Sequence, residues 1–546
     1  MRRKNQLKKI VLGGLLSLTL ATGLVGCGAS GSAGTSSVSG GAAGKSEDEL
    51  VIAVADELSN IDILHAYSTE VDLVLNQVLE GLYYYDNNSE IQPKLAESVE
   101  QPDDTTYVYK IKDNVDFSDG THLTAEDVVF SLERHKNPDN SSELGWMFEN
   151  VKSIEQTGDY EVTVKLKQPD ALWQDTLATT ASLVISKKYF EENKDDFGTA
   201  KGGIIGSGPY KISEWDQGVQ LELEVNNNWW DKDTDLAFKK LTYKTIPDAA
   251  VVKSALESGE VDVTQNISAE TANELESSGK AQISATDYYG TTFLSFNNSK
   301  KPFDDANVRK AIASAIDREQ IVDTLYYGKY AQKGGDTPVN ENFIREEKEV
   351  WSDFFAGADN YSYDVEKAKE YLAKSSVPDG FEAKFVYETS EPVHESIGLV
   401  IQQNLAEIGI KLELEGLTRA EIMNFRYGGT EERDYDIMVT AWGSDYPDPI
   451  GVLLPMFASK NTAAGGSNWA EYRNDEFDKL LEKSSKELDK KKRAEILKDA
   501  LNVYIEDEPS VNLYHHYKLF ATSNRVDYEF SPSLMFGTYI KDFKKK

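Results

Sequence analysis

Hydrophobic and polar residues alternate with a period of two in several short stretches of the chain, a pattern typical of β-strands. The first stretch is Glu49–Leu58, and similar ones cover residues 106–111, 161–166, 219–225, 291–296 and 410–416. Between them, apolar residues recur at helical spacing. Strands and helices are intermixed and no internal repeat is visible, which favours mixed α/β lobes over a barrel or a solenoid.

Capping residues mark the ends of the predicted helices. Ser68 is placed to cap a helix over 68–82, and Thr124, with Asp127 three residues later, predicts the start of another that runs to Arg134. The two strongest helical patterns cover residues 305–328 and 393–410, and glycines close them, at Gly328 and Gly409.

One stretch, residues 434–450 (DYDIMVTAWGSDYPDPI), combines two features that rarely occur together. Its first half alternates like a half-buried strand, with Ile437, Val439 and Ala441 on one side. A carboxylate, Asp445, follows the end of this strand, and two prolines stiffen the exit. We therefore expect an acid held in a fixed position beyond an apolar strand.

The N-terminus predicts export. A basic start and an apolar run end in LVGC at Cys27, which resembles the lipobox of bacterial lipoproteins, so residues 1–26 are interpreted as a signal peptide. The resemblance implies cleavage before Cys27 and acylation of this only cysteine of the chain, which leaves no disulfide. The Gly- and Ser-rich stretch that follows, up to residue 48, predicts a flexible tether.

Composition narrows the function further. The net charge of −35, without a basic cluster beyond the first nine residues, excludes a nucleic-acid partner. The chain has 546 residues, which predicts more than one hydrophobic core. Motifs for a serine nucleophile, a thiol enzyme or a zinc helix are missing from the sequence. His515 and His516 are adjacent, so in a strand they point to opposite faces, which predicts no joint metal site; we expect neither metal nor cofactor.

Four blocks in sequence order resemble the oligopeptide- and dipeptide-binding family of ABC-importer receptors (solute-binding protein family 5). They are the Leu-Ala-Glu-Ser to Leu-Thr-Ala-Glu-Asp-Val region within 92–134, the Gly-x-Gly-Pro-Tyr hairpin from Gly206, the helix-forming block from Phe293 to Val322, and AWGSDYPDP at 441–449. The match spans nearly the whole chain after the tether.

The resemblance implies an α/β, two-lobed, periplasmic-binding-protein-like fold with a hinge and with an additional α+β domain inserted in lobe I. We expect lobe I at residues 49–76, 201–289 and 515–546, the inserted domain at 77–200 and lobe II at 290–514. The implied function is not enzymatic: a monomeric receptor closes on a peptide and delivers it to a membrane permease and its ATPase.

The resemblance also implies the ligand-binding residues. In this family the acid after Trp-x-x binds the α-ammonium of the peptide, and that position is Asp445 here; Gly443 leaves room for the ligand backbone, and the strand end through Trp442 can pair with it. Weaker candidates lie near the hinge crossings and after the first strand; they are Tyr514, His515, Tyr288 or Tyr289, and Leu58.

The ligand and the role stay open at this level. Receptors of this family bind other solutes as well, so an oligosaccharide, a nickel chelate or haem is an alternative to a peptide. A surface lipoprotein of the same fold, used for peptide sensing or adhesion, is an alternative to import. The lipobox and tether resemble those of Gram-positive bacteria, which implies a lipid-anchored protein on the outer face of the cell membrane.

Overall fold

A mixed sheet of eleven strands is the central element of the fold. The computed structural model describes residues 45–65, 68–358, 360–528 and 542–546, so the predicted signal peptide, Cys27 and most of the tether lie outside it. From one edge to the other the strands are β15 (Lys411–Leu417), β14 (Glu382–Glu388), β16 (Ile437–Gly443), β12 (Ala281–Phe296), β17 (Ser510–Ser523), β11 (Val263–Gln265), β1 (Glu49–Val54), β10 (Lys240–Thr245), β9 (Gln220–Val225) and β8 (Tyr210–Asp216), and β13 (Ala331–Lys333) pairs with β17.

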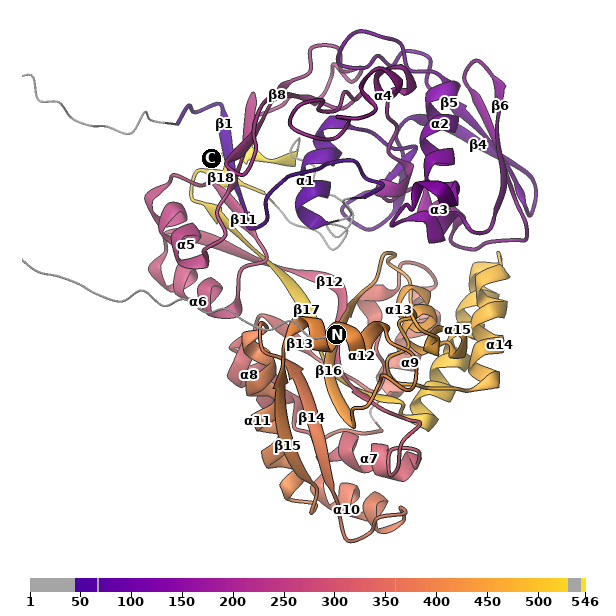
Figure 1. Cartoon of the computed structure of the whole chain (residues 1–546), viewed down its shortest axis with the longest axis vertical. Helices are drawn as coiled ribbons and strands as arrows, with labels where there is room; N and C mark the ends of the chain where they lie inside the picture. The colour runs from indigo at the N-terminus through magenta and orange to yellow at the C-terminus, as the bar shows by residue number, and fades with distance from the viewer. Residues whose placement is uncertain (1–44, 66–67, 359, 529–541) are drawn as a thin grey trace, which may run out of the picture. The chain divides into compact units, whose positions relative to one another are not determined.

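Two long antiparallel strands, β12 and β17, belong to both halves of this sheet. Near Ser523, β17 pairs with β11 on one side and with β12 on the other, whereas the other half of β12 pairs with β16, from Phe296 to Gly290. Their mutual pairing is regular up to Asp287 and Tyr517, shifts register, and resumes at Thr291 and His515. Figure 1 shows the two strands running side by side between the two lobes of the fold.

The first lobe is built around β1, which runs parallel to β10 and β11. Helix α1 (Thr69–Val78) is fastened to it by the Tyr243 hydroxyl, which donates a hydrogen bond of 2.9 Å to the carbonyl of Leu73. Val51 and Ala53 of β1 pack with apolar residues of two more helices, α5 (Ala249–Ser258) and α6 (Ala269–Ser278).

Residues 77–200 contain a separate antiparallel sheet of four strands. Its order is β4 (Ala96–Asp103), β5 (Thr106–Ile111), β7 (Glu161–Leu166) and β6 (Val151–Gly158), and α2 (Ala125–Lys136) packs on β6 and β7. The same segment holds the strand pair β2 (Tyr83–Tyr85) and β3 (Ile91–Pro93) and the short helices α3 (Trp173–Thr176) and α4 (Lys187–Asn193). The predicted limits of the inserted domain remain a prediction.

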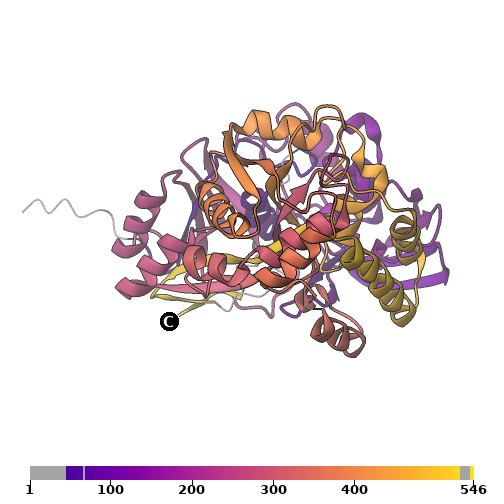
Figure 2. The same ribbon diagram turned by 90° about the horizontal axis from the view of Figure 1, so that it is seen from below.

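Helices cover the other half of the large sheet. A core of apolar residues from β14, β16 and α11, among them Phe385, Ile397 and Val439, is fully buried there. The helices of this part are α7 (Ala306–Ala315), α8 (Arg318–Tyr326), α9 (Lys348–Gly357), α10 (Val365–Ala373), α11 (Pro392–Ala406), α12 (Arg419–Tyr427), α13 (Ile450–Phe457), α14 (Asp475–Lys486) and α15 (Lys490–Asp507). The last two lie against each other (Figure 2), and a small pair of strands, β18 (Val526–Asp527) and β19 (Lys544–Lys545), ends the described chain.

The predicted helix starts are confirmed. Ser68 caps α1 by accepting a hydrogen bond of 3.3 Å from the backbone amide of Val71, and Thr124 forms a capping box with Asp127 at the start of α2. Reciprocal bonds of this kind satisfy amides that would otherwise lack partners in the first turn. None of the described helices is both long and apolar enough to span a membrane.

Two sequence predictions need correction. The stretch 305–328 forms two helices, α7 and α8, because Asp317 accepts a hydrogen bond of 2.9 Å from the Gln320 amide and so starts a second helix. The strand at the start of residues 434–450 is not half-buried. Met438 and Thr440 are as buried as Ile437 and Val439, since β16 lies inside the sheet and both of its faces are covered at that end.

Candidate functional site

A cavity of about 710 Å³ lies where the two long strands pass between the lobes. Its volume is in the range of roughly 300–1,000 Å³ that is usual for ligand sites. The lining residues come from β12 and β17, the start of α1, the loop before α6, α8, the end of β14, α11, α12 and β16; they include Thr69, Ser268, Tyr288, Thr292, Tyr326, Glu388, Glu391, His394, Arg419, Arg426, Ala441, His516 and Lys518.

Tyr288, Thr292 and His516 form the part of the wall that the long strands contribute. The rings of Tyr288 and His516 meet edge to face at 6.3 Å, and Thr292 Oγ1 lies 2.6 Å from His516 Nε2. Burial, and then the nearby His394, lower the pKa of His516 to about 4, so this imidazole is neutral at pH 7. These three side chains therefore offer aromatic faces and hydrogen-bonding groups without charge.

The wall from the second lobe carries charge. Arg419 lies 3.6 Å from the buried carboxylate of Glu388, and Arg426 points its guanidinium toward the ring of Trp469, 4.9 Å from its centroid. His394 is buried, and its Nδ1 has no hydrogen-bond partner among the described residues. Burial, and then Arg426, lower the pKa of His394 to about 4. A polar ligand group can satisfy such a nitrogen when it enters the cavity.

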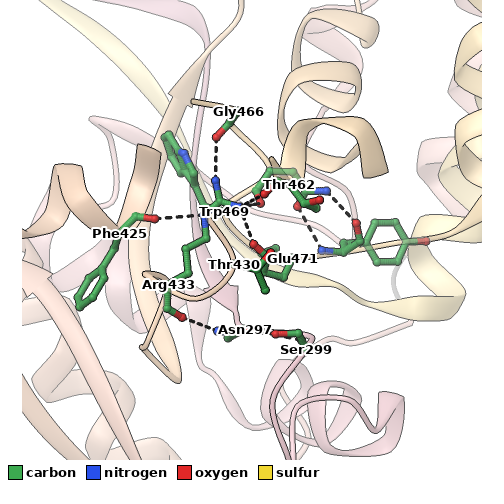
Figure 3. A network of polar contacts seen from close by, with 12 residues as sticks. Asn297, Ser299, Phe425, Thr430, Arg433, Thr462, Gly466, Trp469 and Glu471 are labelled. Carbon is green, nitrogen blue, oxygen red and sulfur yellow. Dashed lines mark hydrogen bonds and ion pairs between the residues drawn. The ribbon is translucent and has the colours of Figure 1, made fainter. Parts of the chain in front are cut away.

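A buried ion pair fixes this wall from behind. Arg433 and Glu471 are both inaccessible to solvent and lie 2.6 Å apart (Figure 3). The same guanidinium donates to the carbonyl oxygens of Phe425 and Arg426 at the end of α12, at 3.2 and 3.1 Å, and to those of the loop that carries Trp469. It thereby sets the position of Arg426 at the cavity and of Trp469, whose ring packs against Trp442.

Asp445 lies in the loop after β16 and is half-buried. It is not among the residues that line the cavity, but its charge reaches two groups beside it. Burial first, and then Asp445, raise the pKa of Tyr288 to about 12. Burial raises the pKa of Asp72 on α1 to about 8. The attraction of Lys518 opposes this rise, and the repulsion of Glu70 and Asp445 adds to it. Asp445 is therefore close to the cavity end formed by Tyr288 and α1.

Asp448, three residues further on, has a structural role. Arg493 of α15 binds its carboxylate through two hydrogen bonds, of 2.6 and 2.8 Å, and the carboxylate also accepts from the Ile450 amide at the start of α13. Burial alone would raise the pKa of Asp448, but Arg493 holds it below its usual value. This pair anchors the loop that carries Asp445.

Of the weaker candidates, Tyr288 lines the cavity. The remaining predicted ligand residues are not among its lining residues; they are Trp442, Gly443, Tyr514, His515, Tyr289 and Leu58. The Trp442 indole donates to the carbonyl of Gly451, and Gly443 pairs with Gly290 of β12. The hydroxyls of Tyr326 and Tyr514 lie 2.6 Å apart, Tyr289 contacts Ser89, and the Leu58 carbonyl accepts from the Trp215 indole. These residues stay predictions.

The register shift between the long strands explains which neighbours line the cavity. His516 and Tyr288 face it, whereas His515 is buried behind them against Asn512. Gly290 supports this arrangement, since a Cβ at this position would lie 2.3 Å from the Tyr288 ring. Sequence reasoning named Tyr288 as one of two candidates but missed His516 and Lys518 as cavity residues. Strand alternation could not have selected them, because four consecutive residues of β17, 516–519, line the cavity.

A cavity between two lobes, crossed by strands that both lobes share, defines a protein that encloses a small solute. The sequence matches the bacterial extracellular solute-binding proteins, family 5, over residues 90–464. The chain therefore belongs to this family, whose members bind solutes and are not defined by a catalytic reaction.

Several similar proteins align with most of this chain. The oligopeptide-binding protein AppA of Bacillus subtilis is 28% identical over 543 residues, which are 94% of this chain and 95% of the relative. The probable D,D-dipeptide-binding periplasmic protein DdpA of Escherichia coli is 30% identical and covers 82% of this chain and 84% of its own. The crystal structure of Bacillus subtilis AppA with a nonapeptide, 27% identical, matches with a TM-score of 0.69 over 91% of this chain and 99% of that one.

Proposed function

We propose that the protein is an extracellular receptor that captures peptides between its lobes and delivers them to an ABC import permease. The peptide-binding relatives that span the chain support the ligand class. The cavity between the lobes and the two shared strands support capture by hinge closure. In this proposal Asp445 binds the α-ammonium of the peptide by a charge-assisted hydrogen bond.

The observation that carries the proposal is the open edge of β16. Strand β14 pairs with β16 only at Ile437 and Met438, so in the described structure no strand pairs with Val439–Gly443 on that side. Ala441, in the middle of this open stretch, lines the cavity, and Asp445 follows two residues after the strand ends. An extended peptide can add to this edge by main-chain hydrogen bonds, with its ammonium beside Asp445. Such pairing tolerates many side-chain sequences.

The proposal includes the position of the receptor on the cell. Cys27, acylated after removal of residues 1–26, would hold the protein on the outer face of the membrane, near the permease. Each buried CH₂ of an acyl chain contributes about 0.8 kcal/mol, so two or more chains make a stable anchor. Mass spectrometry of the N-terminal peptide, from protein made in a host with lipoprotein processing, tests this point directly.

Binding of matched peptides tests the main proposal. Tetrapeptides with a free or an acetylated N-terminus are titrated by calorimetry against the full chain in detergent and against Asp445→Ala. We expect acetylation and the substitution each to weaken binding at least about thirtyfold, because removing one partner of a desolvated charge pair costs about 2 kcal/mol or more.

The matched control is Asp434→Ala. This carboxylate is 83% exposed, precedes the start of β16 and pairs with Lys300 outside the cavity, so peptide affinity should stay unchanged. If acetylated peptides bind as tightly as free ones, or if none of the peptides binds while a sugar or a metal chelate does, the peptide proposal is wrong and the family assignment alone stands.

A further inference from the structure

Lys518 is a buried cation on the cavity wall that has no ionic partner among the described residues. It lies on β17 opposite Thr286 of β12, lines the cavity and is 7% exposed. In the part of the chain that the structure describes, its ammonium makes no hydrogen bond or ion pair; it lies over the Phe520 ring, 5.7 Å from the ring centroid. Burying a charge in this way is costly unless a partner of opposite charge is supplied.

The acids that attract Lys518 do not reach it. Glu70 and Asp72, in the first turn of α1, favour its charged form, but neither carboxylate lies within 4.0 Å of the ammonium. Asp72 Oδ1 is itself buried and has no hydrogen-bond partner among the described residues. Burial lowers the pKa of Lys518 to about 8, against the attraction of the two acids, so the group still carries its charge at pH 7.

Lys518 and Asp445 both lie near the end of the cavity that Tyr288 and α1 form. The carboxyl group of Asp72 interacts electrostatically with both of them, and Tyr288, which Asp445 also influences, lies on the same wall as Lys518. Both groups therefore lie within electrostatic range of the same carboxyl group, that of Asp72, at this end of the cavity. A ligand that carries an ammonium and a carboxylate close together can pair with both.

We propose that Lys518 forms an anion subsite beside the ammonium site and selects peptides with a glutamate or aspartate side chain at the first or second position. This inference rests on the proposed function. It narrows the ligand from peptides in general to peptides whose N-terminal end is acidic. A charge-assisted hydrogen bond between the ligand carboxylate and the ammonium would provide the contact that the fold leaves out.

The test compares glutamate with glutamine, which differ in charge but hardly in shape. Tetrapeptides with a free amine and an amidated C-terminus, of the form Glu-Ala-Ala-Ala and Ala-Glu-Ala-Ala, are titrated against the full chain together with their glutamine counterparts. Amidation removes the terminal carboxylate as a second source of negative charge. We expect a glutamate preference of about tenfold or more at one of the two positions, the usual effect of a hydrogen bond to a charged group.

Variants of Lys518 then show whether this residue causes the preference for glutamate. In Lys518→Met the ratio of the affinities for the glutamate and glutamine peptides should fall close to one, whereas Lys518→Arg should retain a preference for glutamate. Lys384→Met, at an exposed lysine outside the cavity, should leave this ratio as it is in the wild type. A ratio of one in the wild type, or a preference that persists in Lys518→Met, would overturn the inference. The wild-type ratio decides the question even if Lys518→Met does not fold. If none of the tetrapeptides with a free amine binds, acidic or neutral, the proposed function itself has failed.

Discussion

At the scale of single residues, the protein contains two kinds of buried charge. Arg433 and Glu471 are fully paired and hydrogen-bonded inside the second lobe, as are Arg493 and Asp448 below the loop of Asp445. Lys518 and the imidazole of His394 instead border the cavity with donors or acceptors that the described chain does not satisfy. The first kind holds the site in place, and the second kind is available to a ligand.

Loss of Arg433 should therefore destabilise the protein strongly. In Arg433→Met the Glu471 carboxylate stays buried without its main partner, which typically costs about 3–5 kcal/mol. Arg473 contacts the same carboxylate at 3.4 Å from a position that is 57% exposed, so Arg473→Met should cost about 1 kcal/mol or less. Urea unfolding of the two variants measures the difference; equal losses would contradict the role assigned to Arg433.

At the scale of elements, contacts between α3 and the second lobe fasten the two lobes to each other. Asp175 of α3 pairs with Arg345 at 2.6 Å and accepts a hydrogen bond of 2.8 Å from the Tyr85 hydroxyl. Next to it, Thr176 and Tyr446 are joined by a hydrogen bond of 3.1 Å between their hydroxyls. Since Tyr446 follows Asp445 directly, these contacts connect closure of the lobes to the proposed ammonium site.

Asp175→Asn should weaken peptide binding without touching the ligand. In the closed arrangement Arg345 would lose its charged partner in a buried place, whereas with the lobes apart water could solvate it. The closed form would thus be destabilised selectively, and we expect peptide affinity to fall about tenfold or more, because only the closed fraction binds tightly.

Calorimetric titration of one peptide measures this effect. Lys187→Gln removes an ion pair with the 60% exposed Glu126 in the same segment, and its affinity should equal that of the wild type. An unchanged affinity in Asp175→Asn would show that the ion pair contributes nothing to closure.

At the scale of the whole molecule, buried histidines make stability depend on pH. Burial lowers the pKa of His135 and His515 to about 3 and of His394 and His516 to about 4, against 6.5 in an unfolded chain. Below pH 6.5 the unfolded chain therefore binds more protons than the folded one, and stability falls as the pH decreases toward 4. Asp72, whose pKa is raised from 3.8 to about 8, has the opposite effect over the whole of this range, because the folded chain binds its proton there and the unfolded chain does not.

His135→Gln isolates one histidine outside the cavity. His135 stacks on Phe148 and hydrogen-bonds to Ser142, and we expect its replacement by glutamine to make the decline of the unfolding free energy between pH 6.5 and 4 shallower, by about 1.4 kcal/mol for each pKa unit removed. Urea unfolding at several pH values provides the comparison, and parallel curves for His135→Gln and wild type would refute the prediction.

Local signals were sufficient for much of the fold. Ser68 and Thr124 were identified as caps because a cap depends on a few neighbouring residues, and the strands at 106–111 and 161–166 end where their alternation ends. The single helix predicted over 305–328 failed because two helices in succession share one apolar periodicity, and only the Asp317 cap separates them.

The sequence by itself determined the family, the strands and helix starts that local patterns specify, and the placement of Asp445 directly after an apolar strand. Tertiary structure decided the rest, because burial and pairing join residues far apart in the chain. The register shift between β12 and β17 decides that His516 and Lys518, not His515, face the cavity. Two apolar cores, one that includes Met438 and one that includes Ile437 and Val439, bury both faces of the first half of β16. The partner of Arg433 is set by how a distant loop packs against α12. A one-residue change of register would turn each strand residue to the other face, which no local pattern can report.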